Sequence, residues 1–112
     1  IFHSVMVHYE NDLPVQIEDR CVNAEIVPEY LAQDYSQTTP HAYLSLIAPL
    51  TEGEHIVEAV RASAEECALL NIKEHDPCLL IRRKTWSASS IVSHARLLFP
   101  GSRYRLQGRF MY

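Results

Sequence analysis

Met6, His8 and Glu18 carry side chains that could act together on a bound ligand. They lie in two stretches of alternating residues that are separated by a short polar segment. If residues 11–13 form a three-residue loop, Met6 pairs with Glu18 and His8 with Gln16, and cross-strand partners share a face of the sheet. A two-residue loop would shift the register by one residue and separate them. We therefore expect a thioether, an imidazole and a carboxylate on one face of a half-buried hairpin.

Two hydroxyl groups extend this set of candidate ligand-binding residues. Thr39 precedes Pro40, which is typical of a helix N-cap followed by proline at the first helical position, and the free N–H groups of such a helix start can bind an anion. Ser93 lies in a row that is otherwise apolar and contains Ile91, Ala95, Leu97 and Phe99. Its hydroxyl is either satisfied by the backbone or makes a polar contact inside an apolar pocket. Two interpretations also remain open for Glu18, as an exposed strand carboxylate or as a ligand contact.

The other reactive side chains form no catalytic or metal-binding pattern. None of the six histidines belongs to an H-x-x-x-H or H-E-x-x-H motif, and the chain has no G-x-S-x-G and no Gly-rich phosphate loop. The sequence therefore predicts no metal site, no cofactor and no catalytic residues. The cysteines are Cys21, Cys67 and Cys78, without a C-x-x-C pair. This odd number argues against a disulfide framework and favours buried thiols in a reducing, cytoplasmic environment.

The basic stretch "IRRKTW" is a weak signal for nucleic-acid binding. Strand alternation places Arg82 and Lys84 on one face and Arg83 and Thr85 on the other, so solvated arginines are the favoured interpretation. The formal net charge of −4 also argues against phosphate binding by this segment alone. No apolar run is long enough for a membrane span, and no secretory signal is present.

A sheet with helices between its strands is needed to position these residues. The 112 residues suffice for one domain, and because the chain starts at Ile1 inside a strand pattern we expect a fragment of a longer polypeptide. Period-two alternation predicts strands over 5–9, 15–20, 54–62, 77–87, 90–100 and 103–110. Helices are expected over 27–36, 38–50 and 63–72, the last with a capping box of Ser63 and Glu66. This order predicts an α+β domain with an antiparallel sheet.

Four stretches of the sequence resemble one protein family. They are "HYENDLPVQIEDRCVN", "PEYLAQDYSQTTPHAYL", "APLTEGEHIVEAV" and "CLLIRRKTWSASSIVSHARLLFPGSRYRLQGRF", and the most specific part is "SHARLLFPGSRYRLQGRF". Together they resemble the UTRA domain, the effector-binding half of one branch of GntR-type bacterial transcription regulators, with the greatest likeness to its histidine-utilisation branch. The resemblance covers nearly the whole chain. It implies a chorismate-lyase-like fold and a single UTRA domain over residues 1–112 that lacks its own start.

The resemblance also assigns a matching position to each candidate residue. Sugar-phosphate sensors of the family carry an R-x-R pair on the first strand, at the positions of Met6 and His8. Glu18 matches a ligand-contacting glutamate, Thr39 a serine at a helix start, and Ser93 a second glutamate. Relative to those sensors, this site lacks two positive charges and one negative charge. Because an arginine pair suits a dianionic phosphate, the difference indicates a flatter, less charged, aromatic ligand.

For the histidine-utilisation branch, the implied effector is urocanate. In that interpretation Glu18 accepts the imidazole N–H, and the helix start at Thr39 donates to the carboxylate. Ser93 donates or accepts, His8 hydrogen-bonds or stacks, and Met6 forms an apolar wall. The family also implies a repressor that forms a homodimer and contacts operator DNA only through an N-terminal winged helix-turn-helix, which this segment lacks. A lyase-type enzyme on the shared fold and a pure dimerisation module without an effector are the alternatives.

Overall fold

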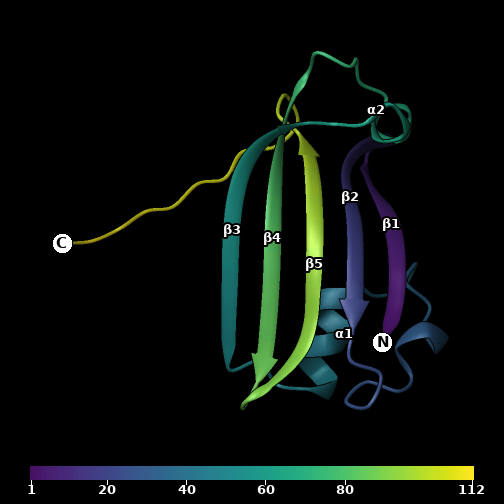
Figure 1. Ribbon diagram of the computed structural model, residues 1–112, viewed down its shortest axis with the longest axis vertical. Coiled ribbons are helices and arrows are strands. Elements are labelled where there is room, and N and C mark those ends of the chain that lie inside the picture. The colour runs from purple at the N-terminus through teal and green to yellow at the C-terminus, as the bar shows by residue number, and fades with distance from the viewer.

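A five-stranded antiparallel sheet forms the body of the protein, and the computed structural model describes residues 1–112 (Figure 1). Its strands, in the spatial order β1-β2-β5-β4-β3, are β1 (Phe2–Glu10), β2 (Leu13–Val22), β3 (Glu52–Arg61), β4 (Pro77–Ser87) and β5 (Ser90–Pro100). The connections contain the 3-10 turn η1 (Tyr30–Ala32) and the helices α1 (Pro40–Ile47) and α2 (Ala64–Leu70). The α+β antiparallel fold predicted from the sequence is confirmed.

The first hairpin differs from the prediction at its tip. Asn11 and Asp12 both have positive φ angles, 51° and 65°, and form a two-residue turn, so Glu10 pairs with Leu13 rather than with Pro14. Turns of this kind fit the twist of the flanking strands. A bulge then leaves Val15 unpaired, and it restores the pairs His8–Gln16 and Met6–Glu18. The predicted three-residue loop is therefore wrong, while the predicted grouping of side chains is correct.

The helices begin where the sequence indicates. The Thr39 hydroxyl accepts a hydrogen bond from the Ala42 N–H at the start of α1, and Ser63 and Glu66 form the complete capping box of α2. The helix expected over 27–36 is reduced to the single turn η1. Its continuation is interrupted because the Asp34 carboxylate accepts hydrogen bonds from the backbone and hydroxyl of Ser36, which favours a turn over a helix. None of the helices has the length and apolar character that crossing a bilayer requires.

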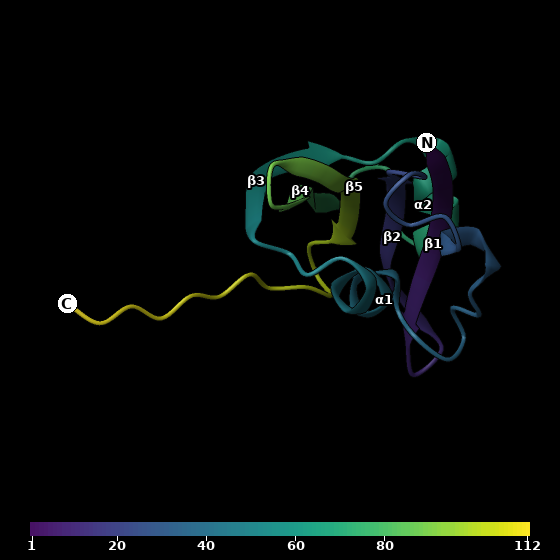
Figure 2. The same ribbon diagram turned by 90° about the horizontal axis from the view of Figure 1, so that it is seen from below.

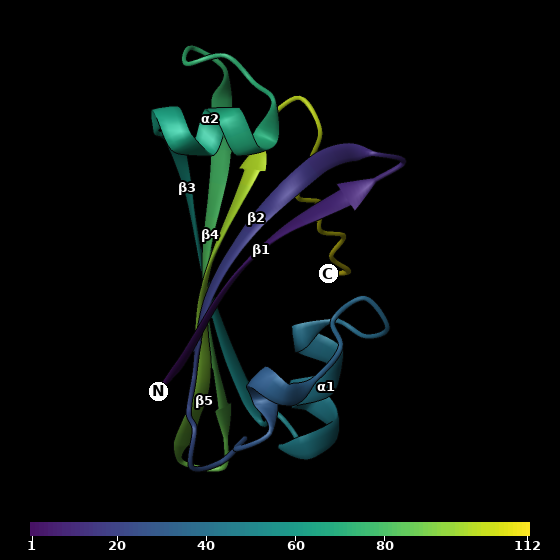
Figure 3. The same cartoon turned by 90° about the vertical axis from the view of Figure 1, so that its right-hand side faces the viewer.

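The two helices cover opposite faces at opposite ends of the sheet, as Figure 3 shows edge-on. We call these faces the α1 face and the α2 face. On the α2 face, Leu70 packs against a cluster that contains Ile17, Cys78, Leu80 and Leu98. On the α1 face, Leu44 packs with Val22, Val27, Tyr30, Ala48 and Val92. A second apolar cluster on the α1 face is formed by Ile81, Ala95, Leu97 and Phe99, with the ring of Tyr104 against it. Each face therefore has its own core.

Three expectations need correction at the margins of the sheet. The segment 103–110 is not a strand: after the turn that follows β5, it runs past β3 and away from the body (Figures 1 and 2). Cys67 and Cys78 are buried free thiols as predicted, but Cys21 is only partly buried. Arg82 is exposed as predicted, whereas Arg83 is half-buried. Residues 104–112 make no backbone–backbone hydrogen bond, so alternation alone does not make this segment a strand.

Candidate functional site

The strand register arranges the candidate residues in neighbouring rows on the α1 face. One row runs across the sheet through Met6, Glu18, Leu97, Ile81 and Val57. The next contains Ser4, Arg20, Ala95, Arg83 and His55. Beyond them, Ser93 pairs with Thr85. Three of the predicted residues, Met6, Glu18 and Ser93, are thus brought within two rows of each other by pairing alone.

A buried ion pair lies at the centre of these rows. The Nε of Arg20 donates to Oε2 of Glu18 at 2.8 Å, and both side chains are almost fully buried, with 2% and 6% of their surface exposed. The other carboxylate oxygen of Glu18 lies 2.9 Å from Nε2 of His8, whose side chain is 30% exposed. Glu18 is therefore a structural ion-pair partner and not an exposed strand carboxylate. A buried charge without such partners would cost several kcal/mol.

The environment of Glu18 favours its charged form. Burial alone would raise the pKa of the carboxyl group, but the hydrogen bond with His8 and the charge and hydrogen bond of Arg20 outweigh it. The pKa of Glu18 consequently lies below its usual value. A carboxylate has room for about four hydrogen bonds, so Glu18 can still accept one from a ligand beside His8.

The hydroxyl of Ser93 belongs to the same network. Arg20 donates from its Nη1 to Ser93 Oγ at 3.1 Å, and Ser93 Oγ lies 2.9 Å from Thr85 Oγ1. Both hydroxyl residues are buried, and no buried side-chain polar atom of the protein lacks a hydrogen-bond partner. The Ser93 hydroxyl is thus satisfied by side chains, which differs from the backbone interpretation. A continuous chain of polar contacts links His8, Glu18, Arg20, Ser93 and Thr85.

Arg83 is a half-buried cation on this face that has no carboxylate partner. Its Nε donates to Nε2 of His55 at 2.8 Å, so that imidazole nitrogen must be the unprotonated one. Burial lowers the pKa of the Arg83 guanidinium, and the positive charge of Arg20 lowers it further. Burial and then Arg83 also lower the pKa of His55. A half-buried guanidinium with only a neutral partner is suited to a carboxylate ligand.

The start of α1 faces this charged region. His41, in the first turn, lies close enough for Arg83 and Arg20 to reinforce the effect of burial, and together they hold its pKa below the usual value. The helix start offers fewer free donors than expected. Pro40 has no N–H, and the Ala42 and Tyr43 N–H groups donate to the hydroxyl and carbonyl oxygens of Thr39. The His41 N–H is the donor that remains for an anion there.

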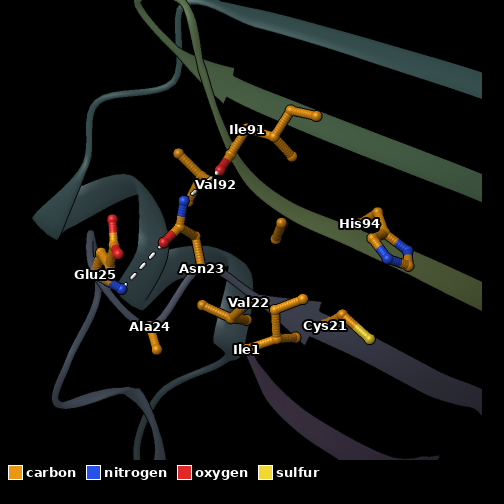
Figure 4. Close-up of a pocket in the computed structure, with 10 residues that line it drawn as sticks. Ile1, Cys21, Val22, Asn23, Ala24, Glu25, Ile91, Val92 and His94 are labelled. Carbon is orange, nitrogen blue, oxygen red and sulfur yellow. Dashed lines mark hydrogen bonds between the residues drawn. The ribbon is translucent and has the colours of Figure 1, made fainter.

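Two hollows of the molecule border these rows: Ser93 lines one of them, and Arg83 and Ala95 line the other. One, of about 510 Å³, is lined by residues including Ile1, Cys21, Asn23 and His94, and it shares only Ser93 with the polar network (Figure 4). Asn23, one of its lining residues, donates to the Ile91 carbonyl and accepts from the Glu25 N–H. Another, of about 460 Å³, is lined largely by alternate residues of the α2 face. Neither of these two hollows is centred on the polar network of His8, Glu18, Arg20, Ser93 and Thr85.

The structure connects most of the residues predicted from the sequence and adds two arginines to them. His8, Glu18 and Ser93 are connected through hydrogen bonds, and Met6 is half-buried opposite Glu18. Thr39 is exposed and reaches the site only through the helix that it caps. The two added residues are Arg20 and Arg83; strand alternation places Arg20 on the face of Glu18 and Arg83 on the face of Thr85. With Glu18 neutralising Arg20, the region retains one unpaired positive charge, at Arg83.

The chain is similar to one protein family and to several of its members. Residues 1–105 match the family model described as the UTRA domain. The chain is 83% identical over 110 residues to the "Histidine utilization repressor" of Klebsiella aerogenes, and 64% identical over 110 residues to the protein of the same name from Pseudomonas aeruginosa. These alignments cover 98% of this chain but only 46% and 44% of the two relatives. The chain therefore spans less than half of the length of these relatives.

A solved structure has the same fold throughout. The crystal structure of the C-terminal domain of histidine utilization repressor from Pseudomonas syringae pv. tomato matches with a TM-score of 0.95 and 63% sequence identity. The match covers 99% of this chain and 79% of that chain. The similarity thus extends over all five strands and both helices.

Proposed function

The chain belongs to the UTRA domain family, and from this we infer that it is the effector-sensing domain of a transcriptional repressor of histidine-utilisation genes, with urocanate as its effector. The relatives named above are repressors and not enzymes. The observation that carries the choice of effector is the arrangement of charges on the α1 face. The buried pair Glu18–Arg20 lies beside Arg83, which has no carboxylate partner.

The charge of the region fits a monoanion with a polar ring. Urocanate carries one carboxylate, one imidazole and a flat conjugated link between them. A single unpaired guanidinium balances a single carboxylate, whereas a dianionic phosphate would leave excess negative charge in a half-buried place. The lost R-x-R pair at Met6 and His8 supports the same conclusion.

We assign the contacts as follows. The urocanate carboxylate pairs with Arg83 and accepts from the His41 N–H at the start of α1, which Thr39 caps. Its imidazole N–H donates to Glu18, beside His8, and Met6 covers the ring from the neighbouring strand position. Ser93 accepts a hydrogen bond from Arg20, and this contact keeps Arg20, and with it Glu18, in orientation.

The whole repressor acts as a homodimer and binds operator DNA through a part outside this segment. A palindromic operator matches a two-fold protein, and the net charge of −4 makes this domain unsuited to phosphate. Urocanate binding then releases the DNA. A ligand that binds the DNA-free conformation of the repressor more tightly shifts the population toward that conformation. Such a regulator acts in the cytoplasm.

Calorimetric titration tests the effector assignment. Urocanate should bind, and cinnamate should bind at least about tenfold more weakly, because it keeps the acrylate but leaves Glu18 without a ring N–H donor. Equal binding of the two compounds would contradict the role of Glu18, and no binding of urocanate would contradict the proposal. A mobility shift with the full-length repressor and operator DNA tests the release step.

A further inference from the structure

Tyr104 is an aromatic side chain on the α1 face that the site described above does not use. Its ring stacks on Phe99, with the ring centroids 3.8 Å apart and the ring planes inclined by 17°. It also packs against the cluster that contains Ile81, Ala95 and Leu97. Tyr104 is half-buried, so one side of its ring is covered by Phe99 while part of the residue stays accessible.

The residue before Tyr104 fixes the position of this ring. The guanidinium of Arg103 donates through Nη1 to the carbonyls of Pro14 and Leu70. Its Nη2 donates to the carbonyl of Asn71 at 2.9 Å. These carbonyls belong to the first hairpin and to the end of α2, so Arg103 joins two separate parts of the fold directly before Tyr104. A ring that is held in place before binding loses little freedom when a ligand packs on it.

The apolar cluster under Tyr104 also lies between Glu18 and Arg83. Glu18 pairs with Leu97. Arg83 pairs with Ala95, two residues before Leu97 on β5. Glu18 and Arg83 lie on the two strands that flank β5, so their Cα atoms are about 12 Å apart, given spacings of about 4.8 Å between strands and about 3.3 Å along them. A small ligand that spans the two side chains therefore lies over Leu97 and Ala95, and Tyr104 packs against the cluster to which both belong.

Tyr104 also interacts electrostatically with Arg83. Burial and then the positive charge of Arg20 lower the pKa of the Arg83 guanidinium. Tyr104 and then Glu18 raise that pKa, and such an effect requires the phenol oxygen to lie near the guanidinium. Tyr104 thus borders the cation to which the proposed function assigns the effector carboxylate.

We propose that Tyr104 is a specificity-determining residue of the effector site, and that the conjugated link of urocanate packs on its ring between Glu18 and Arg83. This inference rests on the proposed function and adds to it a residue that selects for a flat ligand. Aromatic rings favour offset stacking at short range, and a planar conjugated group can reach that arrangement. A saturated link is bent and places hydrogen atoms against the ring, so it packs less closely.

A pair of ligands tests this selection. Urocanate and imidazolepropionate carry the same ring and the same carboxylate, but the link is conjugated in the first and saturated in the second. In calorimetry on the full chain, Tyr104→Leu should weaken urocanate binding roughly threefold to tenfold, the size of one aromatic contact. Imidazolepropionate binding should weaken by less than about twofold, and Tyr104→Phe, which keeps the ring, should retain the preference for urocanate. Tyr9→Leu, the same exchange at an exposed tyrosine that alternates with His8, is the matched control and should change neither affinity.

NMR provides a measurement that a purely structural role of Tyr104 would not change. In the parent, the vinyl protons of bound urocanate should shift upfield and show nuclear Overhauser effects to the Tyr104 ring protons, because they lie over the face of the ring. The upfield shift should persist in Tyr104→Phe and disappear in Tyr104→Leu, whose folding circular dichroism verifies. If urocanate binds the parent without these effects, or if Tyr104→Leu keeps the same preference between the two ligands, this inference fails while the proposed function stands. A parent chain that does not bind urocanate would contradict both.

Discussion

Arg20 and Arg83 flank Ala95 in a single row across the sheet, so two guanidinium groups face the same part of the α1 face with only a methyl group between them. One of them is neutralised by Glu18, and the other donates only to the neutral ring of His55. The difference between the two arginines determines what each is expected to do. Arg20 holds the network together, and Arg83 is available for a ligand.

Arg83→Gln should weaken urocanate binding about tenfold to a hundredfold, the effect of losing one charge-assisted hydrogen bond of roughly 1.5–3 kcal/mol. Folding stability should change little, because no carboxylate loses its partner. Calorimetry measures the affinity. Arg82→Gln is the matched control, since Arg82 is the adjacent residue on the other face and is exposed. Equal losses in both variants would argue against Arg83 as the carboxylate anchor.

Glu18→Gln should lower both urocanate affinity and stability. The amide accepts more weakly from the imidazole, so affinity should fall about tenfold to a hundredfold. Arg20, with 2% of its side chain exposed, loses its counter-charge, which should cost roughly 1–3 kcal/mol of the free energy of unfolding. Asp19→Asn provides the control, because Asp19 is adjacent and pairs with the exposed His3 instead. Urocanate binding as tight as in the parent would remove Glu18 from the site.

Glu18 should also make the protein sensitive to acid. Its pKa in the folded protein lies below the ordinary value of 4.5, so its stabilising effect is complete above that value. The effect is lost as the pH falls from about 4.5 through the lower folded pKa. Urea unfolding at a series of pH values should therefore show a steeper loss for the parent than for Glu18→Gln. Glu66, whose pKa is lowered as well, contributes equally to both proteins. Parallel profiles would show that the ion pair is not maintained in solution.

His41 should report on the charges around it. Its ring should titrate below the ordinary pKa of 6.5, because burial and the charges of Arg83 and Arg20 disfavour the imidazolium. Arg83→Gln should raise the pKa of His41, and bound urocanate should raise it too, since its carboxylate screens the arginines. NMR titration of the ring protons measures all three states. No change with Arg83→Gln would place the start of α1 away from the charged rows in solution.

Arginines at Met6 and His8 should weaken urocanate binding by roughly tenfold or more. An arginine at position 6 lies opposite Glu18 and competes for its carboxylate, and replacement of His8 removes a hydrogen bond to the same group. The double variant His3→Arg/Val5→Arg serves as the control in calorimetry, because those side chains alternate with Met6 and are exposed. An unchanged affinity would mean that the first strand does not contact the effector.

The fold was predictable where one physical signal dominates. The bounds of β4 and β5, the Thr39 cap and the Ser63–Glu66 capping box follow from period-two alternation and from local hydrogen bonding. The state of the C-terminal segment was not predictable, because alternation shows that a strand has one apolar face but not which strand lies beside it. The grouping of Met6 with Glu18 was correct although the loop length was wrong.

The residue types of the candidate site were predictable from the sequence, but the hydrogen bonds between them were not. Alternation places Glu18 and Ser93 on one face, yet it does not show that the guanidinium of Arg20 lies between them. Arg83 has the appearance of a solvated strand arginine in the sequence, and only the neighbouring strands make it half-buried. Which of two arginines has a free charge depends on long-range contacts, and these are set by strand order.

Because Val15 is unpaired, the pairing of Met6 with Glu18 does not depend on the length of the turn that precedes it. With a two-residue turn and no bulge, every residue of β2 beyond the tip would change faces, and Glu18 would point away from Met6. A bulge absorbs that one-residue difference. A homologous chain can therefore gain or lose one residue at this hairpin tip and still keep Glu18 opposite Met6. Sequence alignments within the family should place such single-residue gaps at Val15 rather than at Asn11 and Asp12.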